Sequence, residues 1–456
     1  MAVTSAADAR GRVGLWDTLS LLRRNRPFAR LYGAQLISFM GDWFTTVALL
    51  GLVSDLTGSA VLVSLVLVAH TIPFALLAPI GGHLADRFDR RRLMIVADLA
   101  RAALAPLYLL VDSSGQVWLA FAVMASVGGI GALFAPAAQA AVPNLVDPED
   151  LPAANVLVGS AWGAMLAVGG ALGGLVAATL GRDAAFLGDA LTFIVSALLL
   201  LGIRARFSEP REEEESERGL ARSVSESLRY ARGEPRVLAL LAVKAGFGLS
   251  VGVLGLLPLF ALEVWHAGDR GTGILFAARG LGAVVGPFLV RRFTDSLRGL
   301  FLAIGVSFAV YGIGYGLFPF APGIALATIP VFLAHLGGGA QWTLSTYGLQ
   351  RIVPDRHRGR VFALDYGLVT LTIAGSLTLA GWAADHLPPT TVMLVLAGVS
   401  LAWSVAWTAL TSGLRRQGSF EEPATPGPAA PAEAEEATPP PPEETQPEAR
   451  PPLASP

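Results

Sequence analysis

Long apolar runs constrain the fold of this sequence more than any other feature. A helix that crosses the hydrocarbon core of a bilayer needs about 20 mostly apolar residues, and twelve runs meet that requirement. Only 15% of the residues are charged, against about 25% in soluble domains. The sequence therefore predicts an all-α membrane protein with twelve transmembrane helices. The expected spans are residues 31–54, 60–84, 92–111, 116–140, 152–180, 184–203, 237–263, 272–290, 299–319, 322–348, 360–384 and 390–411.

The distribution of arginine predicts how these spans are oriented. Arginine supplies all but one of the 33 basic residues, and the cytoplasmic loops of membrane proteins carry the basic excess. If the N-terminus is cytoplasmic, the outer loops hold only Arg182 and Arg270. We therefore expect a multi-pass protein of the cell membrane with both termini in the cytoplasm. The preference for arginine over lysine, with abundant Ala, Gly and Pro, favours a bacterial source.

Composition divides the chain into five segments. Residues 1–30 lack the apolar core and cleavage site of a signal peptide and are expected to stay as a cytoplasmic segment. Residues 31–203 and 237–412 each contain six spans. The charged linker 204–236 has apolar residues at helical spacing, which predicts an amphipathic helix on the membrane surface. Residues 413–456 are rich in Pro and Glu and should form a disordered cytoplasmic tail.

The two halves echo each other at a fixed offset. Pro27 before span 1 is matched by Pro235 before span 7, and "AAVPNLV" at Ala140 is matched by "QRIVPDR" at Gln350. Many transporters are built from two bundles related by an internal repeat. The echo therefore predicts two pseudo-symmetric six-helix bundles.

A charged stretch, "GGHLADRFDRRR" from Gly81 to Arg92, lies between spans 2 and 3. A carboxylate at Asp86 can face the positive N-terminal end of another helix, an interaction worth about 0.3–1 kcal/mol at an exposed site. Such a contact would favour the conformation in which the two halves meet on the cytoplasmic side. The arginines can pair with acids on neighbouring loops, or they can simply hold the topology.

Twelve spans, a charged middle loop and this stretch together resemble the major facilitator superfamily of secondary transporters. The family's signature between spans 2 and 3 runs G-x-L-a-D-r-x-G-r-k, and Asp89 stands here in place of the second Gly. The resemblance implies alternating access by two six-helix bundles, with a conformational gate in which Asp86 meets span 11 and favours the outward-open state. The gate residues would be Gly82, Leu84, Asp86, Arg87, Arg90 and Arg91.

Further stretches are similar to the branch that contains macrolide and siderophore (enterobactin) exporters. They are "GDWFTTVALLGLVSDLTGSA", "FAPAAQAAVPNLV", "LPAANVLVGSAWG" and "QRIVPDRHRGRVFAL". Span 5 also resembles the antiporter signature GPxxGG, with Gly170 where Pro is usual, whereas span 4 lacks the buried Arg of many proton-driven antiporters. The resemblance implies export and leaves the route of the proton open. The antiporter-like glycine motif comprises Gly169, Gly170, Gly173 and Gly174.

Five ionisable side chains lie deep within the expected spans, where a charge costs about 2.5–3.5 kcal/mol and marks a candidate site. Asp42, near the midplane of span 1, is the first candidate for binding a proton or another cation; alternatively it is hydrogen-bonded to a neighbouring helix. Asp98 and Arg101 share a face of span 3 and either pair or contact substrate. Arg279 faces a cavity or has a distant partner such as Asp42. His70 relays protons or makes a hydrogen bond in the core.

Other side chains within the spans have structural interpretations that are at least as good. Lys244 is close enough to the cytoplasmic end of span 7 to reach the interface. Asp189 and Glu263 lie toward the outer surface and Asp365 toward the inner one. Aromatic side chains either line a cavity for a bulky apolar solute or pack against neighbours and lipid. They are Trp43, Phe44, Trp162, Phe247, Trp342 and Tyr347.

Sequence patterns typical of other protein classes are missing. The chain has no Walker, HExxH or GxSxG pattern, so neither an ATP-driven pump nor a hydrolase is indicated. It has no cysteine for a thiolate nucleophile or a Cys-ligated metal. Its basic residues lie between spans and not on one patch, which argues against binding nucleic acid. We therefore expect no enzyme activity, no cofactor and no metal site.

These observations favour a secondary exporter of small amphipathic molecules, such as drugs, macrolides or siderophores. It would be driven by the proton gradient and function as a monomer in the bilayer. An importer of the same fold, or a lipid or lysolipid translocator, is the alternative within transport. A membrane scaffold or sensor that has lost transport is the alternative of another class, but such a protein would have no need for charges at the midplane.

Overall fold

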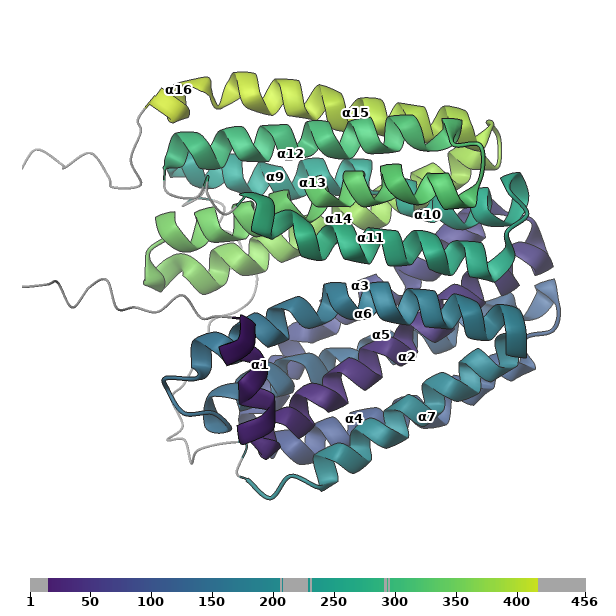
Figure 1. The fold of residues 1–456 in the computed structure, drawn as a ribbon, viewed down its shortest axis with the longest axis vertical. Helices are drawn as coiled ribbons and strands as arrows, with labels where there is room; N and C mark the ends of the chain where they lie inside the picture. Colours follow the sequence, from purple (N-terminus) through teal and green to yellow (C-terminus); the bar gives the residue numbers. More distant parts are fainter. Residues whose placement is uncertain are drawn as a thin grey trace, which may run out of the picture.

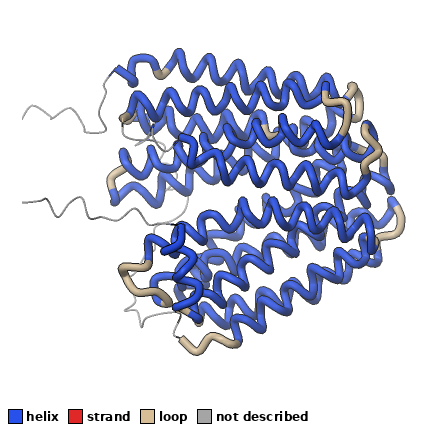
Figure 2. The backbone as a smooth tube through the Cα atoms, in the orientation of Figure 1, coloured by secondary structure: helices blue, strands red, loops and turns tan. Residues whose placement is uncertain are grey.

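The computed structural model describes residues 15–205, 207, 229, 232–290, 293 and 296–416. Within those ranges, twelve helical segments are long and apolar enough to cross a membrane. They run side by side in two groups, one holding α2 to α7 and the other α9 to α15 (Figures 1 and 2). The expected all-α fold, with twelve spans in two six-helix bundles, is confirmed.

The first group, which we call the N-half, starts with a short helix before span 1, and its span 3 continues into a 3-10 turn. Its elements are α1 (Leu15–Arg24), α2 (Arg26–Thr57), α3 (Ala60–Arg87), α4 (Arg90–Leu104), η1 (Ala105–Leu110), η2 (Ser114–Gln116), α5 (Val117–Ala141), η3 (Val142–Asn144), α6 (Leu151–Leu180) and α7 (Arg182–Leu201).

The second group, which we call the C-half, differs from the first in that its first span is built from several pieces. Its elements are α9 (Pro235–Ser250), α10 (Val253–Leu259), the π-helical turn η4 (Phe260–Val264), α11 (Gly268–Val290), α12 (Leu297–Leu317), η6 (Phe318–Phe320), α13 (Ile324–Ile352), α14 (Asp355–Ala384), α15 (Pro389–Leu410) and α16 (Ser412–Arg416).

Both halves begin in the same way. Asn25 caps α2, its side chain accepting a hydrogen bond from a first-turn N–H at 3.0 Å, and Pro27 lies in that turn. Glu234 caps α9 through the backbone N–H of Arg236, and Pro235 follows it. Proline suits the first turn because its missing N–H would have no partner there. Hydrogen bonds from Arg236 lower the pKa of the Glu234 carboxyl. The cap at Asn25 also explains why span 1 starts earlier than expected.

Span 7 is interrupted, which the sequence did not predict. Helix α9 ends at Ser250 and α10 starts at Val253. Between them the backbone N–H of Gly252 donates to the hydroxyl of Ser376 in α14 at 3.0 Å, and that hydroxyl donates to the carbonyl of Leu249 at 2.7 Å. Unpaired backbone groups are costly inside a membrane. Helix α14 therefore supplies the partners that the broken helix lacks.

The most extensive contacts between the halves are those of α6 with α11 and of α3 with α14. Small residues allow the helices of these pairs to approach closely: a Cβ added to Gly381 of α14 would lie 2.7 Å from the Cα of Val61 in α3. The two groups of helices converge toward the right of Figure 1 and spread apart toward the left. The halves therefore meet more tightly at one end of the molecule than at the other.

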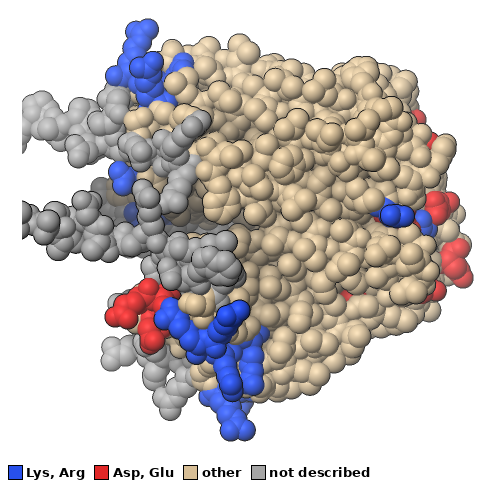
Figure 3. Space-filling view, in the orientation of Figure 1, with Lys and Arg blue, Asp and Glu red and all other residues tan. Residues whose placement is uncertain are grey.

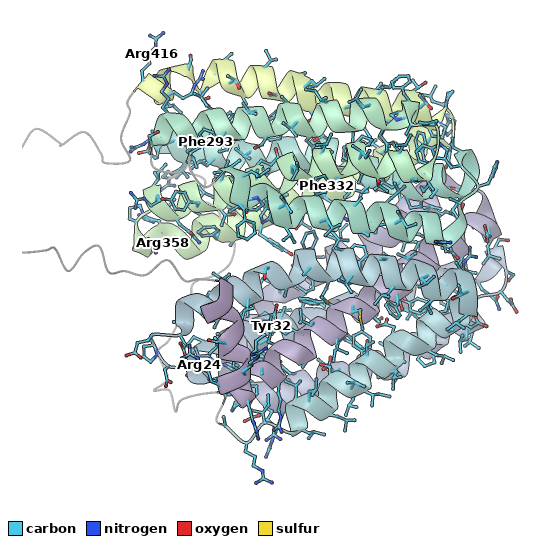
Figure 4. All side chains as sticks on the ribbon, in the orientation of Figure 1. Arg24, Tyr32, Phe293, Phe332, Arg358 and Arg416 are labelled. Atoms are coloured by element: carbon cyan, nitrogen blue, oxygen red, sulfur yellow. The ribbon has the colours of Figure 1, made fainter. Side chains whose placement is uncertain are left out.

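Charged side chains gather at the two ends of the molecule and leave a belt between them almost free of charge (Figure 3). One end, which carries α1 and α16, we call the arginine-rich end; Arg24, Arg358 and Arg416 lie there (Figure 4). The opposite end we call the far end. An uncharged belt between charged ends is the surface that a bilayer-spanning protein needs.

Several expected features fall outside the described residues. Nearly all of the amphipathic helix expected within the linker 204–236 lies there, and so do residues 1–14 and the tail beyond Arg416.

The bridge at the break in span 7 leads to a stability prediction. Replacing Ser376 by Ala removes the hydroxyl that both accepts and donates there, so we expect the free energy of unfolding to fall by about 1–2 kcal/mol. Thr378→Val is the matched control, because the Thr378 hydroxyl bonds only to its own helix, at the carbonyl of Ala374. Reversible unfolding in detergent micelles measures both variants. Equal losses in the two would contradict a special role for Ser376.

Candidate functional site

Asp42 lies at the middle of α2, beside the contact of that helix with α7. The neighbouring Gly41 makes this contact possible, because a Cβ there would collide with the side chain of Asp189. The Asp42 side chain is partly exposed. No hydrogen bond to its carboxylate is formed within the described part of the chain, although Arg101 and His70 interact with it electrostatically. Asp42 is therefore an acid whose hydrogen-bonding capacity is free.

Asp189 of α7 is a second acid next to Asp42. Its side chain is 1% exposed, and the hydroxyl of Thr45 in α2 donates to it at 2.6 Å. The charges of Asp189 and Asp42 act on each other. The sequence placed Asp189 toward the outer surface by its depth, and the structure shows in addition that its side chain is buried against α2. Depth along a helix does not tell which face of that helix meets a neighbour.

Asp98 and Arg101 form a buried ion pair in α4, with 2.5 Å between Arg101 Nη2 and Asp98 Oδ1. The hydroxyl of Ser196 in α7 donates to the other Asp98 oxygen at 2.6 Å. The guanidinium of Arg101 also lies over the rings of Phe193, at 4.3 Å, and Phe134, at 5.1 Å. Of the two possibilities for these residues, the structure shows pairing.

These side chains together form what we call the acidic cluster of the N-half. The ring of His70 stacks on Phe74 in α3, with 6.3 Å between centroids. One guanidinium faces three carboxylates, and an unbalanced charge is costly to bury. The cluster is therefore a place where an added cation or proton is stabilised. Across the described ranges, no three His, Asp or Glu side chains are arranged to hold a metal ion. The acidic cluster comprises Asp42, Asp98, Asp189, Arg101 and His70.

Arg279 lies at the middle of α11, among aromatic rings from both halves. Its guanidinium carbon is 5.6 Å from the ring centre of Trp162, 5.7 Å from that of Phe276 and 6.0 Å from that of Trp43. No acidic side chain in the described ranges lies within ion-pair distance of it, so the possible pairing with Asp42 is not observed. The cavity-facing alternative for Arg279 stays a prediction.

Lys244 and Asp365 form a second buried ion pair, in the C-half. Lys244 Nζ lies 2.8 Å from Asp365 Oδ2, and both side chains are almost fully buried. The ammonium also lies 4.0 Å from the ring centre of Trp342. The expectation that Lys244 reaches the membrane interface is therefore wrong. Asp365 of α14 lies within reach of the Lys244 ammonium. The sequence of α9 alone could not indicate this.

A buried His–Tyr contact in the C-half was also missed. Tyr315 Oη lies 2.9 Å from His335 Nε2, and the ring of Tyr311 packs on both. His335 lies in the apolar stretch "VFLAHLGGGA", and a lone histidine in such a run was the signal that could have drawn attention to it. The charge of Arg279 acts on His335.

The aromatic candidates divide into two sets. Trp43 and Trp162 approach Arg279, and Trp162 is 50% exposed. Phe247 packs edge-on against Trp342, whereas Phe44 belongs to the hydrophobic core. Of these residues, only Trp43 and Trp162 lie at the contact between the two halves and beside Arg279, a charged side chain with no acidic partner within the described residues.

The antiporter-like glycine motif of α6 packs against two helices. On one side, a Cβ at Gly169 would lie 3.0 Å from the carbonyl oxygen of Met40, and a Cβ at Gly173 would lie 2.9 Å from the Cα of Phe44, both in α2. These distances are shorter than side chains tolerate, so a larger residue would force α6 and α2 apart.

The other side of the motif faces the C-half. A Cβ at Gly174 would lie 2.8 Å from the Cα of Gly273 in α11, and a Cβ at Gly170 would lie 3.1 Å from the Cβ of Phe276. Backbone therefore meets backbone between α6 and α11, as in other close helix pairs of membrane proteins. We call this contact the glycine seam.

The signature stretch between α3 and α4 makes contacts within the N-half. Arg90 is buried and donates to the carbonyls of Ala85, at 3.1 Å, Ala140, at 2.7 Å, and Phe207, at 3.2 Å. Arg91 donates to the carbonyls that end α7. Backbone oxygens at helix ends are thus among the partners of these two arginines. Pairing with acids of neighbouring loops stays a prediction.

The remaining gate candidates lie at the end of α3. Gly82, Leu84 and Arg87 belong to its last turns, and the Arg87 side chain is exposed. Asp86 belongs to the same helix, but its side chain lies outside the described residues. The gate contact expected for it stays a prediction.

Comparison with known proteins decides the family. The transmembrane secretion effector family, part of the major facilitator superfamily, matches residues 18–429. The chain belongs to this family. It is therefore a multi-pass membrane transporter of small molecules and not an enzyme.

Two relatives and one solved structure illustrate the likeness of the transporter to known proteins. Macrolide efflux protein A of Streptococcus pyogenes is 24% identical over 79% of the transporter and 90% of its own length. The MFS-type transporter YfiS of Bacillus subtilis is 27% identical over 79% and 88%. A bacterial homologue of the human lysosomal transporter Spinster, in an inward-facing unoccupied conformation, has a TM-score of 0.63 at 15% identity and covers 86% of the transporter and 96% of that chain.

Ion pairs at the far end join the two halves of the transporter. Arg182, at the start of α7, lies 2.8 Å from Asp269 of α11 and 2.8 Å from Asp55 of α2. Ser54 of α2 also donates to Glu263 of η4 at 3.4 Å. Arg182 was counted above only as an outer-loop residue. Its partners come from helices remote in sequence, so only the folded chain reveals the bridge.

Asp385, just after α14, caps the N-terminus of α3 in the other half. Its carboxylate accepts hydrogen bonds from the backbone N–H groups of Ala60, at 2.5 Å, and Val61, at 3.3 Å, and from the hydroxyl of Ser59, at 3.0 Å. A carboxylate at a helix N-terminus is favoured by the helix dipole. The interaction, a carboxylate at a helix N-terminus, is of the kind expected for Asp86, but it is formed at the opposite end of the molecule.

The Lys244–Asp365 pair leads to a second stability prediction. Asp365→Leu leaves a buried ammonium without an acid, so we expect a loss of about 3–5 kcal/mol in the free energy of unfolding. The double variant Lys244→Met/Asp365→Leu removes both charges and should recover most of that loss. A double-mutant cycle measured by unfolding in detergent tests this. If the loss in the double variant equalled the sum of the losses in Lys244→Met and Asp365→Leu, the two charges would not interact.

Proposed function

We propose that the transporter is a proton-driven exporter of small amphipathic molecules. The acidic cluster carries this proposal, because it places three carboxylates and one guanidinium at mid-depth in the N-half. Similarity to macrolide efflux protein A supports export as the direction. The bundles 31–203 and 237–412 would rock about a substrate site between them, and one chain would suffice for the cycle.

Protons would bind where the cluster has excess negative charge. Asp42 is the best placed acid, since its side chain is partly exposed and its carboxylate has no hydrogen bond within the described residues. Asp98 and Asp189 already have hydrogen-bond partners. Trp43 follows Asp42 directly and its ring packs 5.3 Å from that of Phe276 in the C-half. Charge on Asp42 and packing between the halves therefore act on one segment of α2.

The arginine-rich end would face the cytoplasm. This orientation puts Arg182 and Arg270 alone among the described arginines on the outside, in agreement with the basic excess of cytoplasmic loops. The contacts of Arg182 and Asp385 would then close the outer side. Alternating access requires these contacts to break when the outer side opens, and the Asp86 contact would replace them at the inner side.

Replacing Asp42 by Asn tests the proton site. The variant keeps the shape of the side chain but cannot exchange a proton, so we expect proton-driven uptake of a zwitterionic drug such as norfloxacin into inverted vesicles to fall by about tenfold. Exchange of labelled for unlabelled drug without a proton gradient should stay within about twofold of wild type. A pH-sensitive dye inside the vesicles reports the proton released by transport.

The controls separate coupling from folding. Asp42→Glu keeps the carboxyl and should restore part of the proton-driven uptake. Asp183→Asn removes an exposed acid at the start of α7 and should change nothing. Undiminished proton-driven uptake in Asp42→Asn would reject Asp42 as the proton site. Uptake of the drug only in vesicles of the native orientation would indicate an importer, and movement of lysolipid alone would indicate a lipid translocator.

The two helix-capping acids should control opposite sides of the transporter. A cap of this kind is worth about 1 kcal/mol, which corresponds to a roughly fivefold change in the ratio of two conformations. Asp385→Asn should favour opening of the far end, and Asp86→Asn should disfavour it. Ser64 is fully buried where α3 meets Gly255 of α10, so Ser64→Cys in this cysteine-free chain reports opening by its alkylation from outside.

Faster alkylation in Asp385→Asn together with slower alkylation in Asp86→Asn is the expected result. Changes in the same direction, or none, would mean that the two acids do not act as opposing gates. Ser59→Ala provides a further variant, since it removes only one of the donors to Asp385 and should give a smaller increase.

A further inference from the structure

Arg279 is a cation whose surroundings satisfy its charge but not its hydrogen bonds. Two of the three nearby rings belong to the N-half, Trp43 of α2 and Trp162 of α6, and the third, Phe276, lies one turn away in α11. Aromatic faces attract a cation, but they offer no lone pairs to a guanidinium with five N–H donors. The rings therefore hold the charge in place without completing its hydrogen bonding.

One polar atom of Arg279 lacks a partner. Within the described residues, Arg279 Nε is buried and makes no hydrogen bond. Buried polar groups in native proteins nearly always have a partner, so an orphan of this kind requires an explanation. A group that supplies acceptor oxygens to the guanidinium would remove the deficit.

The Arg279 side chain is not fully enclosed by the protein. Arg279 lies at the middle of its helix, and its side chain is partly exposed although the atom Nε is not. Trp162 is half exposed beside it. Since the rings around Arg279 come from both halves, a molecule bound there would contact both halves at once, as a substrate of alternating access must.

We propose that Arg279 binds an oxyanion of the transported molecule, with the apolar or aromatic body of that molecule lying against Trp43 and Trp162. Guanidinium and carboxylate, or another oxyanion such as sulfonate or phosphate, match each other in charge and in bidentate geometry. The substrate class is therefore an amphipathic anion or zwitterion. This inference rests on the proposed function and specifies the ligand of its substrate site.

The same arrangement works against other ligands. A neutral ligand would leave the guanidinium without acceptors of comparable strength, and a cation would meet repulsion from it. Discrimination of this kind combines attraction to one ligand with a cost for its competitors. Arg279 is thus a specificity-determining residue, distinct from the acidic cluster that would bind the proton.

A matched pair of probes tests the proposal. 1-Naphthaleneacetate and 1-naphthaleneacetamide share the same ring and differ in charge at the polar end. Calorimetric titration of the full-length protein in nanodiscs gives the dissociation constant of each. Wild type should prefer the anion by about tenfold, Arg279→Gln should reduce that preference to about one, and Arg279→Lys should keep an intermediate preference.

The controls keep the outcome decisive. Arg270→Gln removes an exposed arginine from the same helix and should behave as wild type. Unchanged amide binding in Arg279→Gln shows that the variant is folded; if it binds neither probe, the Arg279→Lys ratio decides. An anion preference that is absent in wild type, or that survives in Arg279→Gln, overturns the proposal. Because binding needs no gradient, failure of proton-driven transport would refute the proposed function and leave this result standing.

Discussion

The cost of burying charge in hydrocarbon is the constraint on which the rest of this structure depends. Two ion pairs meet that cost by joining elements: Asp98 and Arg101 fix α4 and, through Ser196, tie it to α7, while Lys244 and Asp365 tie α9 to α14. Charges that are not balanced in this way lie where the halves meet or beside that interface. The unbalanced charges therefore lie at or beside the contact between the halves, and these two balanced pairs lie within one half each.

Partners close in sequence could be predicted, and partners remote in sequence could not. Asp98 and Arg101 are three residues apart on one helix, so helical geometry alone suggested their pairing. Lys244 and Asp365 are 121 residues apart, and no pattern in either span indicates that the other holds its partner. The fold class and the spans follow from hydropathy, which is summed over many residues. A single ion pair depends on how each helix is rotated about its axis, and hydropathy carries little information about that rotation.

The signature stretch shows a further limit of sequence reasoning. Its arginines suggested acidic partners, but they did not indicate that Arg90 and Arg91 also donate to the backbone carbonyls of Ala140, Phe207 and Leu200. Every residue has a carbonyl, so such an acceptor leaves no trace in the sequence. Asp385 was missed for the related reason that its partners are the backbone amides that begin α3. Contacts to backbone termini become visible only when the helices have been placed.

The glycine seam between α6 and α11 has a mechanical consequence. Because Gly174 meets Gly273 with no side chain between them, the two surfaces do not interlock as ridges of larger side chains do. If the halves rotate against each other as proposed, that rotation would disturb few rotamers along this line of contact. The seam would then serve as a pivot, and the energy that separates the two proposed conformations would reside at the ends of the helices and not along their length.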